Sequence, residues 1–353
     1  MPYDDGWAAI HLAMPPRVPR TEYSAESHWP LIAAVTGIEV DEHSPPEARA
    51  EASRAFRRAW HYDFAWGTLI GRGEFGDLRT DMGHAEYAAG GVDRRDTIHC
   101  PFSDPEEVLR FDPWEAYGEK DPAELTRRFE ESYRNRQAAL PEEVVTTGIY
   151  VTLISGLIDI FGWDMLLLAA GLDPQRFGEL ANRYASWMQQ YYDALGEADV
   201  PVVMVHDDIV WTAGPFLHPD WYRAYVFPNY RRYFAPLLAS GKTIAFTSDG
   251  DYTAFLDDLV DCGVHGFVLE PMTDMAALAE RYGDSHFFIG NADTRVLLGG
   301  SKPAIRAEVE RCMATGKDKP GFFLAVGNHI PANTPVEACL YYNEVYEELS
   351  PRQ

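Results

Sequence analysis

From about residue 140 onward, short apolar runs alternate with longer stretches in which apolar residues recur at helical spacing. This alternation is typical of strands and helices that build a parallel sheet. Strands are predicted at 144–153, 200–208, 242–249, 265–271, 285–293 and 321–330, and an earlier run at 61–70 would make a seventh. Helices are expected between them, at 219–240, 252–262, 275–282, 302–315 and 335–349.

The first 140 residues are less regular. We expect residues 1–60 to form an N-terminal extension that caps the fold, with a helix around 46–60. The polar stretch 71–121 is long for a plain connection, so it predicts a flap over a site. The whole chain, 1–353, is expected to be one domain.

Polar residues end five of the later strands, and their placement separates two fold classes. Alternating strands and helices fit either a closed barrel or an open doubly wound sheet. A closed barrel would bring the carboxyl ends of all strands to one mouth, whereas an open sheet would spread them. We therefore predict an α/β fold, a (β/α)8 TIM-type barrel closed by residues 140–349, with an N-terminal helical and loop extension. The polar clusters are His206-Asp207-Asp208, Thr247-Ser248-Asp249, Glu270, Asn291 with Asp293, and Asn328-His329.

Five of these residues carry carboxylates, and carboxylates a few ångströms apart raise one another's pKa unless a cation neutralises them. The remedy would be a bound metal, a cationic substrate or a paired arginine such as Arg295. With His206 and His329 nearby, the mixed oxygen and nitrogen set suits zinc, iron or manganese. The alternative is that some polar residues only cap the helices that follow, foremost Ser248, Asp251 and Asp293.

The composition indicates which binding partners and which cellular compartment to expect. The formal charge of -25 is spread along the chain and would repel a phosphate backbone, so nucleic acid is not expected as a partner. The four cysteines form no C-x-x-C pair and the N-terminus lacks the pattern of a signal peptide, so the cytoplasm is expected. The most apolar stretch, 149–172, is interrupted by Asp159, Gly162 and Asp164, which predicts a buried strand and helix and no membrane span.

Two short motifs are discounted. Residues 71–76 fit G-x-G-x-x-G, but a polar loop follows them where a dinucleotide site needs a helix. Asp284-Ser285-His286 with Gly290 is close to the D-x-H-x-x-G signature of corrinoid-carrying domains, but its glycine is one residue late. We therefore expect that this chain does not carry a corrin itself.

Four segments, together nearly half of the chain, resemble the uroporphyrinogen decarboxylase superfamily. They are HDDIVWTAGPFLHPDWYRAYVFPNYRRYFAPL, FTSDGDYTAFLDDLVDCGVHGFVLEP, IGNADTRVLLGGSKPAIRAEVERCM and AVGNHIPANTP. Before residue 200, TDMGHAEY and ISGLIDIFGWDMLLLAAGLD add weaker matches. The resemblance implies a single-domain barrel that is often a homodimer.

The superfamily contains at least two chemistries. True uroporphyrinogen decarboxylases carry an R-Q-A-G-R motif for the acidic side chains of the porphyrinogen, and this chain has no such motif. Other members are methyltransferases that pass a methyl group between a small molecule and the cobalt of a separate corrinoid protein. Those similar to coenzyme M methyltransferases hold zinc with an H-x-C motif and a later cysteine. Here Thr247-Ser248-Asp249 and Asn328 occupy these positions.

Because the thiolates are absent, the resemblance points to a harder metal site made by Asp249, Glu270 and His329, with His206 as an alternative ligand. The leading hypothesis is a corrinoid-dependent methyltransferase-like enzyme that demethylates a small O- or N-methylated compound at a divalent metal, with zinc expected. The methyl-corrinoid would be carried by a separate protein partner. Expected catalytic residues are Asp249, His206, Asp208 and His329, and expected substrate-binding residues are Trp211, Asn291, Asp293, Asn328 and Asp207.

Two alternatives stay open. One is a decarboxylase of a smaller acid, in which an aspartic acid or a histidine supplies a proton to a carbanion. The other is a non-catalytic protein whose acidic mouth and tryptophans, including Trp211, hold a cationic ligand. A stoichiometric transition metal would contradict the binding hypothesis and weaken the decarboxylase hypothesis.

Overall fold

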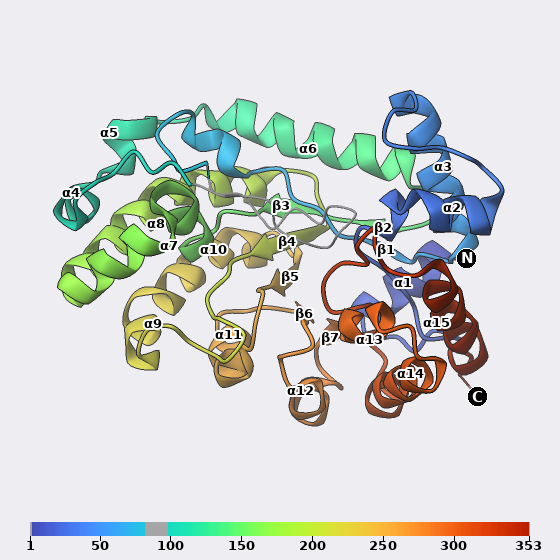
Figure 1. The fold of residues 1–353 in the computed structure, drawn as a ribbon. Helices are drawn as coiled ribbons and strands as arrows, with labels where there is room; N and C mark the ends of the chain where they lie inside the picture. The colour runs from blue at the N-terminus through green and yellow to red at the C-terminus, as the bar shows by residue number, and fades with distance from the viewer. Residues whose placement is uncertain (1, 82–97, 353) are drawn as a thin grey trace.

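Six parallel strands form the centre of the fold (Figure 1). The computed structural model describes residues 2–81 and 98–352. The six strands are paired in the order in which they follow one another along the chain. They are β3 (Thr147–Ile149), β4 (Val202–His206), β5 (Thr243–Thr247), β6 (Gly266–Val268), β7 (Phe287–Ile289) and β8 (Phe322–Phe323). Each lies inside a strand that the sequence predicted. Of the polar residues that end the predicted runs, His206 and Thr247 are the last residues of β4 and β5, and the others follow the strands.

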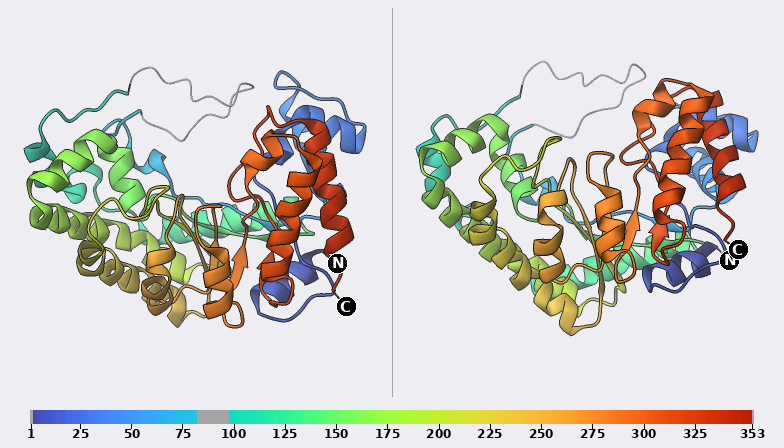
Figure 2. Two further views of the ribbon diagram at one scale, coloured as in Figure 1. Left: turned by 60° about the horizontal axis from the view of Figure 1, so that its bottom comes forward. Right: turned by 90° about the horizontal axis from the view of Figure 1, so that it is seen from below.

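Helices connect these strands and lie around the outside of the sheet (Figure 2). The predicted helix at 219–240 is in fact two helices, because Pro228 has no N–H to continue the first and instead stands in the first turn of the second. The helices that connect the strands are α7 (Ile154–Leu172), α8 (Pro174–Glu197), α9 (Pro219–Tyr225), α10 (Phe227–Ala239), η3 (Thr253–Phe255), α11 (Leu256–Asp261), α12 (Met275–Tyr282), α13 (Thr294–Leu298) and α14 (Lys302–Gly316), and α15 (Val336–Leu349) follows the last strand.

The N-terminal half of the chain supplies the rest of the barrel wall. β1 (Phe64–Ala65) pairs in parallel with β2 (Val144–Val145), and Ile70 forms a parallel bridge with Ile149 of β3. This part of the wall confirms the predicted strand at 61–70. The short β1 ends at Ala65, and the next residue, Trp66, lies at the mouth of the barrel.

Residues 19–21 lie between the last strand and the first. The N–H of Leu324, just after β8, donates to the carbonyl of Pro19 over 2.9 Å, and the N–H of Asp63, just before β1, donates to the carbonyl of Arg20 over 2.8 Å. Arg20 and Leu324 form an isolated bridge, and the bond from Asp63 is a single contact, so the paired strands form two sheets and not one continuously closed sheet. Residues 140–349 therefore supply most of the barrel wall, as predicted, and the N-terminal segment lies in the gap between the last strand and the first.

The N-terminal wall segment gives no apolar run because it contains Arg20 and Glu22. Both side chains are fully buried, and their charges are paired over 3.1 Å. In a sequence, two charged residues so close together suggest a surface loop, because burying charges is costly. The tertiary structure nevertheless places both in the interior.

Apolar side chains fill the space inside the strands, and α1 (Pro2–Ile10) closes one end of it. Ala9 and Ile10 of α1 pack in one cluster with strand residues that include Val144, Met204, Phe287 and Phe323. Gly6 lies against the carbonyl of Asp63, just before β1, so α1 covers the amino ends of the strands. A cavity in the barrel must then open at the carboxyl ends.

The remaining helices belong to the N-terminal region. They are η1 (Ala25–Ser27), α2 (Trp29–Thr36), α3 (Pro46–Ala59), η2 (Arg72–Phe75), α4 (Pro105–Arg110), α5 (Pro113–Tyr117) and α6 (Pro122–Ala139). The helix predicted around 46–60 is confirmed as α3. The predicted flap at 71–121 contains residues 82–97, which lie outside the described residues, and its described parts include η2, α4 and α5.

One helix of the described residues, α7, is long and apolar enough to cross a membrane by length and composition. An 18-residue window of α7 is 67% buried inside the protein, and Gly162 has a φ of 71° that kinks the helix. Helices α4 and α8 pack against it. As predicted for residues 149–172, this segment is the end of a buried strand followed by a buried helix.

Replacing Gly148 with alanine is expected to destabilise the barrel. An added Cβ would lie 1.9 Å from the carbonyl oxygen of Met204 on β4, so the strands would have to move apart. Overpacking in cores typically costs about 1–3 kcal/mol, and a backbone neighbour that cannot rotate away puts this change at the upper end. Urea unfolding would measure it. Gly171→Ala is the matched control, because it lies in α7 with open space around it and should be neutral or stabilising.

Candidate functional site

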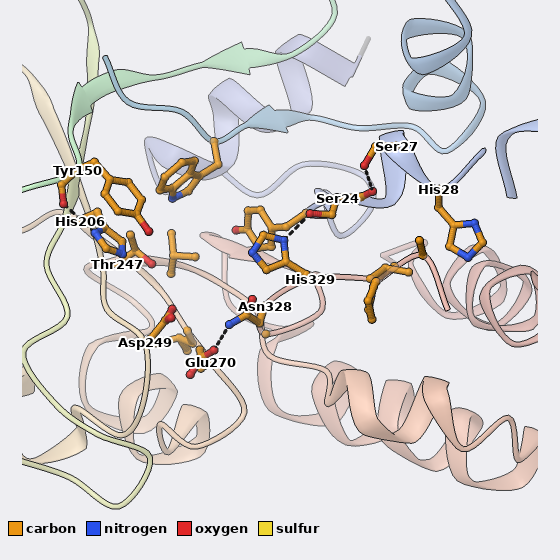
Figure 3. A pocket seen from close by; sticks show the side chains of 18 residues that line it. Ser24, Ser27, His28, Tyr150, His206, Thr247, Asp249, Glu270, Asn328 and His329 are labelled. Carbon is orange, nitrogen blue, oxygen red and sulfur yellow. Dashed lines mark hydrogen bonds between the residues drawn. The ribbon is translucent and has the colours of Figure 1, made fainter. Parts of the chain in front are cut away.

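A cavity of about 500 Å³ opens at the carboxyl ends of the barrel strands (Figure 3). Five residues predicted for the site line it, His206, Asp249, Glu270, Asn328 and His329, together with residues that were not predicted for the site. The lining residues are Tyr23, Ser24, Ser27, His28, Trp66, Tyr150, His206, Thr247, Asp249, Val268, Leu269, Glu270, Gly327, Asn328, His329, Ile330, Pro331 and Ala332. This volume is typical of a site for a small molecule.

His206 and Asp249 line the acidic end of the cavity, and Asp208 lies beside them outside the lining. His206 ends β4, and its Nε2 lies 3.2 Å from Oδ1 of Asp208. The same Oδ1 accepts the backbone N–H of Asp249, the second residue after β5, over 2.9 Å. One ligand atom from each of the three side chains lies within 4.8 Å of the other two. Two adjacent strands therefore bring one nitrogen and two oxygen donors to one point.

The carbonyl oxygen of Tyr150 fixes the orientation of the His206 ring. It lies 2.8 Å from Nδ1 of His206, and a carbonyl can only accept, so Nδ1 carries a proton. The Tyr150 ring stacks on the imidazole with centroids 3.7 Å apart. Burial alone would lower the pKa of His206, but Asp208, with Asp249 behind it, raises this pKa to about 9. Nε2 therefore faces the carboxylates and either donates a proton to them or binds a cation.

Asp249 and Glu270 lie side by side at the same end and repel each other. Burial, followed by the charges of Asp208 and Glu270, raises the pKa of Asp249 well above its ordinary value of 3.8. Asp249 is open to solvent on the cavity side, so water weakens this repulsion without removing it. The pKa of Glu270 is also raised, first by burial, although Gly250 donates its N–H to Oε2 over 2.6 Å and Asn328 donates to Oε1.

The structure groups the candidate metal ligands differently from the predicted set of Asp249, Glu270 and His329. Among the described residues, the group whose ligand atoms converge is His206, Asp208 and Asp249. Glu270 is held by Gly250 and Asn328, and Nδ1 of His329 is hydrogen-bonded to the hydroxyl of Ser24, away from His206 and Asp249 (Figure 3). Asp249 and the alternative ligand His206 both belong to this group, because strand order places β4 directly beside β5.

The N-terminal segment 23–28 forms the opposite wall of the cavity, which sequence reasoning missed. The N–H of Ile330 donates to the carbonyl of Tyr23 over 2.9 Å, and Ser24 has a φ of 66° that is unusual for a residue with a side chain. Trp66 and Tyr150 were also missed, although both follow strands β1 and β3 as the polar residues follow the later strands. The predicted strands 61–70 and 144–153 run past both residues, so the strand-end rule could not single them out.

Asp207 does not line the cavity, although the sequence suggested substrate binding. It is fully buried and accepts the N–H groups of Ile154 and Ser155 at 3.1 and 2.6 Å, and it also accepts the hydroxyl of Tyr230. These bonds cap the start of α7. Burial raises the pKa of Asp207 to about 6, against the effect of these hydrogen bonds.

Replacing Asp207 with alanine is therefore expected to lower stability and not ligand binding. The change leaves buried donors without an acceptor, which costs about 1–3 kcal/mol each at most sites. Urea unfolding should show the loss, while the metal content of the folded variant stays at the wild-type value. A variant of normal stability that has lost only substrate affinity would contradict this structural role.

Three other predicted substrate-binding residues lie outside the cavity lining. Asn291 donates from its side-chain amide to the carbonyls of Glu270 and Thr273 at 3.1 and 3.0 Å. Asp293 caps α13 by accepting the N–H of Arg295 and pairs with that arginine, so the capping alternative holds there. Trp211 is 47% exposed and packs against Trp163 and Phe216. Asn328 alone of this group lines the cavity.

A family model described as "Uroporphyrinogen decarboxylase (URO-D)" matches residues 131–349, which is more than half of the chain. The chain belongs to the URO-D family. It is 28% identical over 185 residues to a uroporphyrinogen decarboxylase of Chromohalobacter salexigens, which covers 51% of this chain and 50% of that protein. It is 29% identical over 171 residues to a uroporphyrinogen decarboxylase of Thermus thermophilus, 48% of each chain. The matched part of this URO-D family member thus spans about half the length of these relatives.

A solved structure described as a methyltransferase from Methanosarcina mazei superposes on the whole chain. The TM-score is 0.65, 98% of each chain is covered, and the sequences are 17% identical. A likeness at this identity shows a shared fold. It confirms the barrel class of this URO-D family member, while the chemistry must be argued from its own residues.

Proposed function

We propose that this URO-D family member is a methyltransferase-like enzyme that removes a methyl group from a small O- or N-methylated compound with the help of a divalent metal. The observation that carries the proposal is the convergence of His206, Asp208 and Asp249 beside a small-molecule cavity. Membership in an enzyme family favours catalysis over ligand binding alone. The binding hypothesis also relied on Trp211, which does not line the cavity.

The residues present fit a zinc site. Zinc binds imidazole nitrogen and carboxylate oxygen at about 2.0–2.2 Å, and three donors with an open fourth position are typical of catalytic sites. The contact of 3.2 Å between Nε2 of His206 and Oδ1 of Asp208 suits two ligands of one ion, and small side-chain rotations would bring in Asp249. A cation here would also relieve the repulsion that raises the pKa of Asp249.

Each residue of the acidic end then has a definite task. The carbonyl of Tyr150 holds the proton on Nδ1 of His206, so Nε2, which faces Asp208, is the nitrogen that would bind the ion. Asp208 orients Asp249 through the backbone N–H, and Glu270 is held by Gly250 and Asn328. When bound, the metal would act as a Lewis acid on the oxygen or nitrogen that loses its methyl group.

The charge of the cavity argues against a porphyrinogen as substrate. No arginine or lysine is found among the described residues that line it, whereas Asp249 and Glu270 are both present. A substrate with eight carboxylates would meet repulsion and no counter-charge. The methyl acceptor that the family resemblance implies is a corrinoid on a separate protein, and we propose this partner together with a cytoplasmic location and a homodimer.

The second candidate is decarboxylation of a smaller acid. Two observations favour it: the curated relatives are uroporphyrinogen decarboxylases, and a raised pKa keeps Asp249 protonated for longer as the pH rises. In that reaction Asp249 would donate its proton to the carbon that loses carbon dioxide. This reaction would not require a metal ion.

The test combines metal analysis with an assay that needs no partner protein. The purified protein is reconstituted with zinc, dialysed and analysed for bound metal, and free cob(I)alamin then serves as methyl acceptor with a panel of methyl ethers and methylamines. We expect one ion per chain and methylcob(III)alamin formation that chelation abolishes. A metal-free protein that releases carbon dioxide from an acid and methylates nothing would overturn the proposal in favour of the second candidate.

A further inference from the structure

The side chain of Thr247 lies between two of the proposed metal ligands. Thr247 ends β5 and is the register partner of His206 at the end of β4, and Asp249 follows it by two residues. Adjacent strands lie about 4.8 Å apart. Figure 3 shows Thr247 at the acidic end, between His206 and Asp249. The Tyr150 ring stacks on the imidazole from the side of β3, so Tyr150 flanks the acidic end and Thr247 forms its floor.

Alternation along β5 points the side chain of Thr247 into the cavity. Ala245 packs with Met204 in the core cluster inside the barrel, whereas Phe246 meets Tyr230 of α10 on the outside, with ring centroids 6.0 Å apart. Thr247 follows Ala245 by two residues, so it faces inward as well. It keeps 8% exposure and lines the cavity. Its hydroxyl can therefore meet a ligand.

Hydrogen-bond acceptors dominate the surroundings of Thr247. Asp249 and Glu270 offer carboxylate oxygens, which accept when they are ionised. The side-chain amide of Asn328 is a donor, but it already donates to Glu270. An oxygen or nitrogen held beside the metal keeps electron density that carboxylates would repel. The neutral hydroxyl of Thr247 is the group on the floor that can donate to such an atom.

We propose that Thr247 is a catalytic residue whose hydroxyl donates a hydrogen bond to the substrate oxygen or nitrogen that loses the methyl group. This rests on the proposed function and adds a residue to it. The bond between methyl carbon and that atom breaks, its electron pair stays on the atom, and the methyl group passes to the cobalt(I) of the corrinoid. Electron density on the atom rises, so a positioned donor stabilises the transition state more than the ground state. Thr247 keeps its proton throughout.

This role can be separated from metal binding. Zinc sites in proteins use thiolate, imidazole and carboxylate ligands, and a threonine hydroxyl is not among them. Thr247→Val keeps the branched shape of the side chain and removes only the hydroxyl. We therefore expect the metal content of Thr247→Val to equal that of the wild type.

The experiment uses the full chain loaded with cobalt(II), and azide is the probe for a nitrogen ligand beside the metal. The visible absorption of cobalt follows azide binding without any substrate. We expect Thr247→Val to bind azide about 3- to 10-fold more weakly than the wild type, as the loss of one hydrogen bond predicts. In the zinc-loaded protein, kcat for methyl transfer to cob(I)alamin should fall at least about 10-fold with little change in KM.

Two further variants separate the hydroxyl from the shape of the side chain. Thr247→Ser restores the hydroxyl and should recover most of the azide affinity and most of kcat. Thr243→Val makes the same chemical change at the first residue of β5, which does not line the cavity, and it should behave like the wild type.

Each outcome supports or overturns the role of Thr247. Wild-type azide affinity and kcat in Thr247→Val would overturn it, and so would a Thr247→Ser variant as impaired as Thr247→Val. Loss of cobalt from Thr247→Val would make Thr247 a metal ligand instead of a donor. Azide binding that depends on the hydroxyl, in a protein that transfers no methyl group, would support the donor and overturn only the proposed function. A wild type that takes up no cobalt would overturn both.

Discussion

Replacing Asp249 with asparagine is expected to lower metal content and turnover together. The variant keeps the size of the side chain but loses the carboxylate that completes the group with His206 and Asp208. Lewis-acid stabilisation is worth several kcal/mol, and each 1.36 kcal/mol is a factor of ten in rate, so we expect turnover to fall by at least about 100-fold. Metal analysis and the cob(I)alamin assay measure the two effects on one preparation.

The same substitution should not weaken the metal-free protein. Asp249 is repelled by Asp208 and Glu270, and this repulsion raises its pKa, so a neutral side chain at residue 249 relieves an unfavourable interaction. The melting temperature of the metal-free variant should therefore equal or exceed that of the wild type. Asparagine also caps a helix about as well as aspartate, so a purely capping residue would tolerate the change.

Glu270→Gln is the comparison variant for Asp249→Asn. Glu270 lies beside the converging group but is not part of it, and glutamine retains an oxygen for the N–H of Gly250. We expect a smaller loss of metal content than in Asp249→Asn. If both variants bound metal and turned over like the wild type, the metal hypothesis would lose its support and decarboxylation would take its place.

Replacing Glu143 with alanine is expected to cost about 3–5 kcal/mol of stability, the range seen when one partner of a buried ion pair is removed. Glu143 lies just before β2 and accepts from Arg57 of α3 at Nε over 2.8 Å and also at Nη2. Both residues are buried, with 3% and 9% exposure. The variant leaves the Arg57 guanidinium in the interior with Glu26 as its remaining carboxylate partner, at 3.1 Å.

A double variant tests whether the loss of stability comes from leaving the Arg57 charge unpaired. Arg57→Met with Glu143→Leu replaces both charges by apolar groups of similar size, which is often neutral for buried pairs, so it should recover most of the loss. Urea unfolding would give both values, and neither change should alter the metal content of the folded protein. A loss below about 1 kcal/mol in Glu143→Ala would show that the pair does not tie α3 to the barrel.

The sequence predicted the strands of the barrel well because each is a short apolar run that ends in polar residues. This rule located His206, Asp249, Glu270, Asn328 and His329 at one mouth, as the cavity lining confirms. It failed for Asp207, which is adjacent to Asp208 in the chain but points into the core. Alternation along a strand sends neighbouring side chains to opposite sides, and a loop after the strand keeps no fixed alternation that a sequence could show.

The sequence by itself determined the order of strands and helices, the barrel class and the residue types at the mouth, because hydrophobic periodicity is a local property of the chain. Only the tertiary structure decided which donors converge and which merely cap a helix. It also placed Arg20 and Glu22 in the barrel wall and Tyr23 in the cavity, against the polar appearance of this segment. These outcomes depend on contacts between residues more than 300 positions apart, such as Ser24 with His329, and local patterns carry no record of such contacts.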